Sequence, residues 1–348
     1  MLDYINTSIQ KVSVHHVGNQ TNGELLKISK EPLDIGEDKL KQLLKKFFLH
    51  PFTTPEFYNF TFSNQDHTLN PVYSYATQMF DSPKLFHAST INIAKHLFEL
   101  SMHPQIKSGD MFVAYFSEIV VDDELTDAIG IFKSETRQEF LKIDASSEQF
   151  MINYEDGINI DKLDKGCLIV NTDRDKGYKV CIVDKLNKAS EAQYWKDSFL
   201  QLKPCSDDYH YTKEFLNITK NYVTEKLSEE FEVSKADKID LLNRSVAYFK
   251  SHDSFDKEDF EQEVFQDKNI IKSFQNFDTI YREENEIELE DNFDISSQAV
   301  KKQARVFKSV LKLDKNFHIY IHGNRELIEK GVDTDGRKYY KIYFNEEN

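Results

Sequence analysis

The sequence has little glycine, proline and cysteine. Eleven glycines and seven prolines in 348 residues leave almost no room for glycine-rich phosphate loops or long flexible linkers, so regular secondary structure should dominate. The three cysteines are odd in number and never form a CxxC pair, which argues against a disulfide framework or a zinc knuckle. Cys167 and Cys181 each fall in an apolar, strand-like run, so we expect buried thiols.

Long apolar runs and a secretion signal are also missing. No stretch approaches the roughly 18 apolar residues that a membrane span needs, and no basic region followed by an apolar one opens the chain. We therefore expect a cytoplasmic protein with no membrane partner. The formal net charge of −16 repels polyanions at long range. A phosphate backbone would have to dock on a locally basic segment.

The composition, the length and the residue patterns of the chain predict an α+β protein with two domains. The hydrophobic content of 39%, with 27 Phe and 17 Tyr, is that of a globular chain, and about 150 residues per domain gives two. Residues 37–49 have the apolar spacing of a helix, whereas residues 111–184 hold short strand-like runs with brief connections. This favours a mostly antiparallel sheet with flanking helices. The polar stretch 228–234 suggests domains 1–230 and 231–348, the second helical and ending in a small β element at 317–322 and 338–344.

No motif of a known catalytic or cofactor site is present. The chain lacks the GxSxG, HExxH, Walker A and kinase signatures. The run from Asn171 to Gly177 alternates oxygen ligands like a calcium loop, but its Gly is seventh instead of sixth and Ile182 replaces the required Glu, so we predict a hairpin turn. The histidine pairs have no third ligand at a suitable spacing and are interpreted as structural or surface residues: His15, His16, His318 and His322. We predict no catalytic residue, no metal and no cofactor.

The charge changes sign abruptly near the C-terminus. Residues 283–294 hold seven acidic residues and no basic one, and residues 301–315 hold six basic residues and one acidic. In one geometry a single helix displays a basic stripe beside an apolar one. In the other, the helix ends near Arg305 and residues 307–313 form a strand, which separates Lys308 and Lys312 from Lys301. The predicted nucleic-acid-binding residues are Lys301, Lys302, Arg305, Lys308 and Lys312.

The acidic half has its own pattern. Glu286, Glu288 and Glu290 alternate with Ile287 and Leu289, which on a strand would place three carboxylates on one face. We interpret this as a solvated strand face. A partner-binding surface and the carboxylate cluster of a metal-dependent nuclease are the two alternatives.

Several strings of this chain resemble one protein family. They are AVKKQ (299–303), LDKNFHIYIHG (313–323), DAIGIFKSE (127–135), LDKGCLI (163–169), EAQYWKD (191–197) and VHHVG (14–18). The chain resembles the bacterial nucleoid-associated proteins (YejK/NdpA-like) over nearly its whole length, in the form seen in Bacteroidetes-type members. The resemblance implies a cytoplasmic protein at the bacterial nucleoid that binds DNA, with RNA as a second candidate ligand. It implies no catalytic residue and no cofactor.

Three functions follow as hypotheses. The first is a non-enzymatic protein that binds double-stranded DNA with weak sequence specificity, since phosphate contacts carry no base information. The second is an adaptor that reaches the nucleoid through partners such as type II topoisomerase subunits, which the family resemblance suggests. The third is a metal-dependent nuclease. The sequence leaves homo-oligomerisation open.

Overall fold

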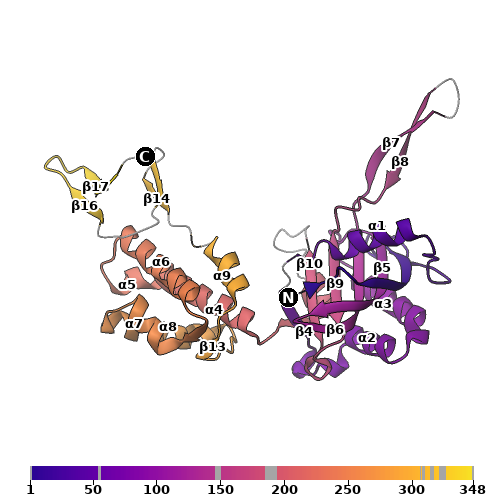
Figure 1. Cartoon of the computed structure of the whole chain (residues 1–348), viewed down its shortest axis with the longest axis horizontal. Helices are drawn as coiled ribbons and strands as arrows, with labels where there is room; N and C mark the ends of the chain where they lie inside the picture. The colour runs from indigo at the N-terminus through magenta and orange to yellow at the C-terminus, as the bar shows by residue number, and fades with distance from the viewer. Residues whose placement is uncertain are drawn as a thin grey trace. The chain divides into compact units, whose positions relative to one another are not determined.

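The computed structural model describes residues 2–53, 56–145, 150–184, 194–305, 307, 310–313, 317–320 and 327–346, with the backbone alone at Asn64 and at 310–312. The chain forms two compact units, Met1–Cys205 (unit 1) and Ser206–Asn348 (unit 2). Figure 1 draws unit 1 in indigo to magenta and unit 2 in orange to yellow. The division precedes the predicted boundary, so the helical segment 208–230 belongs to unit 2.

Unit 1 is built on one antiparallel sheet, as predicted. Its strands lie in the order β11-β4-β10-β9-β6-β5-β2-β3, with β1 paired to β5. The strands are β1 Leu2–Asp3, β2 Ser8–Val17, β3 Lys27–Ile28, β4 Phe57–Phe60, β5 Gly109–Val121, β6 Glu124–Ser134, β9 Lys165–Val170, β10 Lys179–Asp184 and β11 Leu202–Pro204.

Tight turns join the central strands. β5 and β6 are connected by Asp122 and Asp123, whose φ angles are 49° and 65°. Two successive positive φ angles form the turn whose twist matches that of the flanking strands, and aspartate tolerates this conformation. Between β9 and β10 the predicted hairpin turn is confirmed, and it contains the short helix η4 (Arg174–Lys176). It ends at Gly177, with φ 98°, where a Cβ would lie 2.6 Å from the Phe60 carbonyl oxygen.

Helices cover both faces of this sheet. Met111, Val113 and Tyr115 of β5 belong to one core, and the alternating residues Phe112 and Phe116 belong to another. The first core contains α2, α3 and the π-helix η5, and the second contains α1. The predicted burial of Cys167 and Cys181 is confirmed. The helices are α1 Asp38–Leu49, η1 Ser63–Gln65, η2 His67–Leu69, α2 Pro71–Asp81, η3 Pro83–Leu85, α3 Phe86–Leu100 and η5 Tyr194–Leu200.

A second hairpin leaves the sheet of unit 1. It consists of β7 (Gln138–Asp144) and β8 (Met151–Gly157), which pair only with each other in the described part of the chain. Figure 1 shows it extending away from the body of unit 1. We call residues 138–144 and 150–157 the β7–β8 arm.

Unit 2 packs its helices around a core of phenylalanines. Phe215 lies at its centre, with its ring centroid 4.3 Å from that of Phe255 and 5.2 Å from that of Phe260. Stacked and edge-on aromatic pairs of this kind bury large apolar areas. The elements are α4 Asp208–Asn221, η6 Tyr222–Lys226, α5 Leu227–Glu230, α6 Lys235–Ser251, β12 Ser254–Asp256, α7 Lys257–Val264, α8 Lys268–Glu284, β13 Asn292–Asp294 and α9 Ser297–Ala304.

Two small hairpins follow α9 and form the predicted C-terminal β element. They are β14 (Val310–Leu313) with β15 (Phe317–Tyr320), and β16 (Ile328–Val332) with β17 (Lys338–Ile342). Their inner side chains contact Ile239 of α6: Leu313, Ile319, Ile328 and Tyr340. The hairpins thus rest on the helical body of unit 2.

Candidate nucleic-acid interface

The helix α9 presents three of the predicted basic residues to solvent. Ser296 caps the helix by accepting a hydrogen bond from the Ala299 N–H, and its own N–H donates to Thr212 Oγ1 of α4 at 3.0 Å. One face of the helix is buried through Ala299, Val300 and Gln303. Lys301, Lys302 and Arg305 are exposed. The apolar face therefore fixes the helix on unit 2 with its cationic residues outward.

Of the two predicted geometries for the basic segment, the continuous helix is wrong and the helix followed by a strand is right. α9 ends at Ala304, and Lys312 lies in β14, paired in register with His318. Phe307 is buried in the core of unit 2, and the chain then pairs with β15, whose backbone groups replace the helical hydrogen bonds. The structure therefore keeps Lys301, Lys302 and Arg305 together and separates Lys312 from them in the chain. Lys308, Lys315 and His322 lie outside the described residues.

The cations also serve the helix that carries them. They lie in or just after its last turn, where positive charge is stabilising by about 0.3–1 kcal/mol because the helix dipole is negative there. Lys302 Nζ lies 5.8 Å from the centroid of the Tyr209 ring on α4, within cation–π range. Lys302 therefore has a partner within unit 2.

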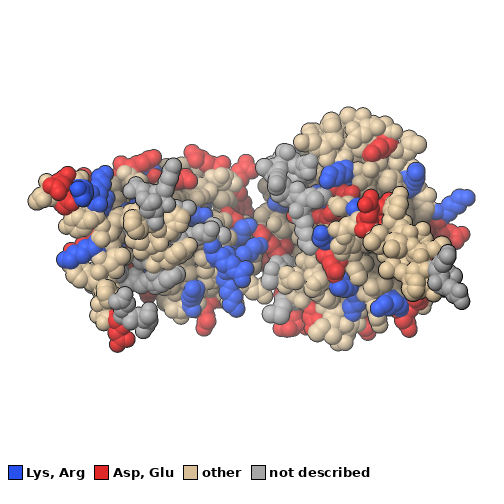
Figure 2. Space-filling model, turned by 90° about the horizontal axis from the view of Figure 1, so that it is seen from above, with Lys and Arg blue, Asp and Glu red and all other residues tan. Residues whose placement is uncertain are grey.

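Charge is strongly segregated within unit 2. Residues 295–348 hold eleven basic and seven acidic residues, whereas residues 206–294 hold eleven basic and 24 acidic ones. Figure 2 shows Lys and Arg side chains gathered over the part of unit 2 in which Figure 1 draws α9. A polyanion would find its favourable field over this C-terminal part.

The hairpin β16–β17 adds cations and aromatic rings that the sequence analysis missed. Tyr339 and Lys341 alternate with the inward-facing Tyr340, and Tyr339 is 45% exposed. Lys341 Nζ lies 4.6 Å from the centroid of the Tyr343 ring. The run Arg337-Lys338-Tyr339-Tyr340-Lys341 was the available signal, because alternate positions of a strand share a face.

The acidic segment before α9 is not a strand. Residues 287–290 have no regular secondary structure, which contradicts the predicted strand face, although Glu286, Glu288 and Glu290 are exposed as expected. The segment follows the end of α8 and is held by Arg282, which donates to the Leu289 carbonyl at 3.1 Å and to Asp291. Because Arg282 and Lys257 also bind the buried Asp278 carboxylate at 2.7 and 2.6 Å, the segment is anchored to the core.

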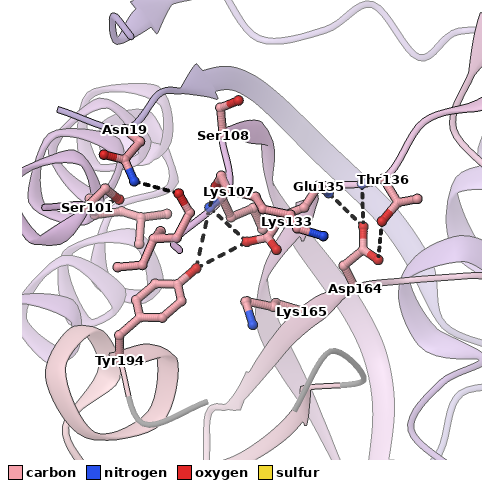
Figure 3. Close-up of polar contacts among 12 residues, drawn as sticks. Asn19, Ser101, Lys107, Ser108, Lys133, Glu135, Thr136, Asp164, Lys165 and Tyr194 are labelled. Atoms are coloured by element: carbon pink, nitrogen blue, oxygen red, sulfur yellow. Dashed lines mark hydrogen bonds and ion pairs between the residues drawn. The ribbon is translucent and has the colours of Figure 1, made fainter. Parts of the chain in front are cut away.

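A buried polar cluster in unit 1 unites three of the strings that carry the family resemblance (Figure 3). Lys133 of β6 and Lys165 of β9 are opposite each other in register. Lys133 Nζ donates to Glu135 at 2.9 Å, to the Lys107 carbonyl at 2.6 Å and to the Tyr194 hydroxyl at 3.4 Å. Lys165 donates to both carboxylate oxygens of Asp184 at 3.0 Å.

The cluster is built as a structural clamp. Burial lowers the pKa of Lys133, and the neighbouring Glu135 carboxylate opposes this change. Both lysines lie over the Tyr194 ring, at 5.8 and 5.3 Å. Two like charges side by side on neighbouring strands are unfavourable unless each has an opposite charge, and here each does. The cluster therefore ties β6, β9, β10 and η5 together.

Two of the four histidines considered above, His15 and His16, have structural partners. His15 is buried between β2 and α3, with its Nε2 3.0 Å from Thr90 Oγ1, and its Nδ1 accepts the Ser29 N–H at 3.2 Å. His16 is paired with Asp110 at 2.9 Å, and His318 is exposed on β15. Among the residues that the structure describes, no three His, Cys, Asp or Glu side chains are placed to hold a metal ion. Nor, within the same residues, is any helix long and apolar enough to cross a bilayer.

Comparison with known proteins agrees with the resemblance read from the sequence. A search among curated proteins found no match. A family model, described as nucleoid-associated protein YejK, matches residues 13–337 and so spans most of both units. The chain therefore belongs to the nucleoid-associated protein YejK family.

Proposed function

We propose that this protein is a non-enzymatic component of the nucleoid that binds double-stranded DNA with weak sequence specificity. The observation that carries the proposal is the exposed group Lys301, Lys302 and Arg305 on an anchored helix, within the net-basic C-terminal part of unit 2. Lysine and arginine contacts to phosphate position a duplex without reading its bases. Lys308 and Lys312 extend the proposed contact in sequence.

Salt dependence tests this proposal. About five phosphate contacts predict that log K falls against log salt with a slope of roughly −4 to −5, because each contact releases condensed counterions. Binding of full-length protein to a fluorescent duplex is measured at several salt concentrations. Changing Lys301, Lys302 and Arg305 to Glu should remove binding at moderate salt with the fold intact.

A matched variant separates local from overall charge. Lys235, Lys268 and Lys272 are exposed at the starts of α6 and α8, and changing them to Glu alters the net charge by the same amount. We expect this variant to keep most of the wild-type affinity. Equal loss of affinity in the two triple variants would show that the charge of the whole unit, and not α9, sets binding.

RNA is the second ligand that we infer for the same unit. The exposed Tyr339 and the Lys341–Tyr343 pair support it, because unpaired bases stack on aromatic rings beside cations. Competition of a single-stranded RNA against the labelled duplex tests this. If Tyr339→Ala leaves the RNA affinity unchanged while Lys301→Glu reduces it, the tyrosine is not part of the binding surface.

An adaptor role is the second candidate function, and the acidic segment favours it. Glu286, Glu288 and Glu290 are exposed on a segment anchored through Arg282, so a basic protein surface would meet them at little ordering cost. Topoisomerase subunits are the candidate partners. Purified subunits should bind the wild type, and changing the three glutamates to Gln should abolish this binding. Together with an absence of duplex DNA binding, that result would favour the adaptor role over the first function.

A further inference from the structure

The β7–β8 arm has one face that is apolar and open to solvent. Cross-strand partners lie on the same face of a hairpin, and so do alternate residues along each strand. The pairs Leu141↔Tyr154 and Ile143↔Ile152 therefore share a face, the acidic pair Glu139↔Asp156 lies at its base, and the alternation along β8 places Phe150 at its other end. The five apolar and aromatic side chains are between 63% and 73% exposed, so the body of unit 1 does not cover them.

The opposite face is suited to water. It pairs Lys142 with Asn153 and Phe140 with Glu155, and the Lys142 ammonium donates to the Glu155 carboxylate at 2.9 Å. The Phe140 ring lies across Gly157, which shields that ring in part. Both faces of the arm are open to solvent, and they differ in composition, because the second face mixes Phe140 and Met151 with charged and polar residues.

The base of the arm is held firmly. Asp164 accepts hydrogen bonds from the N–H groups of Glu135 and Thr136 at 2.6 and 2.9 Å and from the Thr136 hydroxyl at 3.1 Å (Figure 3). Arg137 binds Asp110 of β5, and Asn159 donates to Gln138 at 2.7 Å. The arm therefore leaves the sheet from a fixed origin, and a partner that docks on it pays a reduced ordering cost.

The charge of the arm rules out a polyanionic occupant. Residues 138–157 hold one basic and five acidic residues, so both nucleic acid and an anionic membrane surface would be repelled. An isolated two-stranded hairpin is at best marginally stable, and an apolar layer on one face is what stabilises it. The occupant should therefore be an apolar protein surface. A second copy carries the same acidic charges, but Asp144 and Glu155 lie on the opposite face, and Glu139 and Asp156 lie at the base of the apolar face, away from its centre.

We propose that the apolar face of the β7–β8 arm stacks on the same face of a second copy of this chain, forming a twofold homodimer. A twofold contact buries one patch against itself, and the central Ile143–Ile152 pair, flanked by Leu141 and Phe150, supplies such a self-complementary surface. With about 150–250 Å² per aromatic side chain and somewhat less per aliphatic one, the five residues expose about 600 Å². If the contact covers all of this area, two copies remove at most about 1,200 Å² from water, which is the lower limit of specific interfaces.

The test compares two neighbouring substitutions. Ile152→Lys and Asn153→Lys add the same charge at adjacent positions on opposite faces of β8. The mass of the full chain in solution is measured by light scattering after gel filtration. The mass of one chain is 40.9 kDa. We expect wild type and Asn153→Lys to have twice this mass, as dimers, and Ile152→Lys to have the mass of a single chain. A monomeric wild type up to about 100 μM, or a dimer that survives Ile152→Lys, would overturn the proposal.

Cross-linking locates the contact independently of stability. The natural cysteines Cys167, Cys181 and Cys205 are buried, so a new surface thiol reacts against a low background. Under mild oxidation Ile152→Cys should form an intermolecular disulfide and Asn153→Cys should not. Equal cross-linking of the two variants would refute arm-to-arm stacking, as would binding of the wild-type arm to neutral lipid vesicles in place of dimerisation.

The inference stands apart from the DNA-binding proposal. The arm belongs to unit 1 and the basic segment to unit 2, so Ile152→Lys should leave the affinity for a short duplex with one binding site unchanged. If both proposals hold, each dimer carries two basic segments, and only long DNA gains from the second one.

Discussion

Acidification should destabilise unit 1 through a single buried histidine. His15 is 1% exposed, and its ring is held by Thr90 and by the Ser29 N–H. Since Ser29 donates to Nδ1, that nitrogen is unprotonated in the fold, and the proton lies on Nε2 facing Thr90. Burial, aided by the nearby His87, lowers the His15 pKa from 6.5 to about 4. A second proton would remove the bond from Ser29 and place an unpaired charge in the core.

The sign and size of the effect follow from these values. Between pH 6.5 and about 4 the unfolded chain binds a proton at position 15 and the folded chain does not. The contribution of neutral His15 to the free energy of unfolding is therefore complete above pH 6.5 and is lost as the pH falls towards 4. The difference corresponds to at most about 3.4 kcal/mol of unfolding free energy at 1.36 kcal/mol per pH unit. Because pH 4.5 is still above the folded pKa, about 2 kcal/mol of this should be lost between pH 7 and pH 4.5.

The assay uses the one tryptophan of the chain. Trp195 is fully buried in the core of unit 1, so its fluorescence follows urea unfolding of that unit alone. We compare wild type with His15→Gln at pH 7 and pH 4.5. The variant should be less stable at pH 7, and the gap should narrow by about 2 kcal/mol at pH 4.5, because only the wild type loses the contribution of a neutral His15.

The neighbouring residue supplies the control. His16→Gln alters a partly exposed ring on the other face of β2 and should leave the acid-sensitive component unchanged, since His15 is intact. A gap between wild type and His15→Gln that is the same at both pH values would refute the reasoning.

Three further predictions concern other parts of the chain. Lys133→Met removes the ammonium partner of the buried Glu135 carboxylate, which keeps only the hydrogen bond from the Tyr194 hydroxyl, and should lower the unfolding free energy measured by Trp195 fluorescence by about 3–5 kcal/mol; an unchanged midpoint would contradict the clamp, and adding Glu135→Leu should recover much of the loss. Phe255→Ala should destabilise unit 2 by about 3–5 kcal/mol in the far-ultraviolet circular dichroism transition and leave the Trp195 transition in place; a shift of both would mean that the units unfold together. Purified protein should not cleave duplex DNA with Mg²⁺ or Mn²⁺, and cleavage abolished by Glu288→Gln would restore the nuclease hypothesis.

Much of the fold could be predicted because its signals are local. The helix predicted at 37–49 is α1, and each strand-like run between 111 and 184 coincides with a strand of the structure. The alternation of apolar residues predicts that a run is a strand, but it does not predict which other strand it pairs with. The arm strands β7 and β8 were therefore predicted as strands. Their departure from the sheet left no trace in their own pattern, because it depends on Asp164, which bonds Glu135 and Thr136 across 29 and 28 residues of the chain.

The helix α2 was missed for a different reason. Its sequence is rich in aromatic and β-branched residues, which are poor indicators of helix, and it forms because Val72, Tyr73 and Met79 find a core on the sheet. The start signal was present, since Asn70 caps the helix and Pro71 occupies its first turn. Tertiary burial decided that the helix forms, and the Asn70 cap marks where it begins.

Only part of the candidate site could be predicted from the sequence. The exposure of Lys301 and Lys302 followed from composition, whereas the end of α9 did not, because burial of Phe307 and pairing of β14 with β15 are contacts distant from the helix itself. The aromatic and basic residues of β17 predict a strand, but which of its faces is exposed depends on the packing of Tyr340 against Ile239 of α6. A run of like charges therefore predicts where along the chain a binding surface lies better than it predicts the geometry of that surface.

The adjacency of β5 and β6 in the chain has a kinetic consequence. These strands pair along almost their whole length across a two-residue turn, so the middle of the sheet can close with a very short loop. β4 and β10, by contrast, meet across more than 100 residues and must search longer for each other. We expect the β5–β6 hairpin to be formed in the folding transition state and the β4 edge to join afterwards. Ile131→Val should then slow folding, whereas Val180→Ala should mainly speed unfolding, and the reverse pattern would place the nucleus elsewhere.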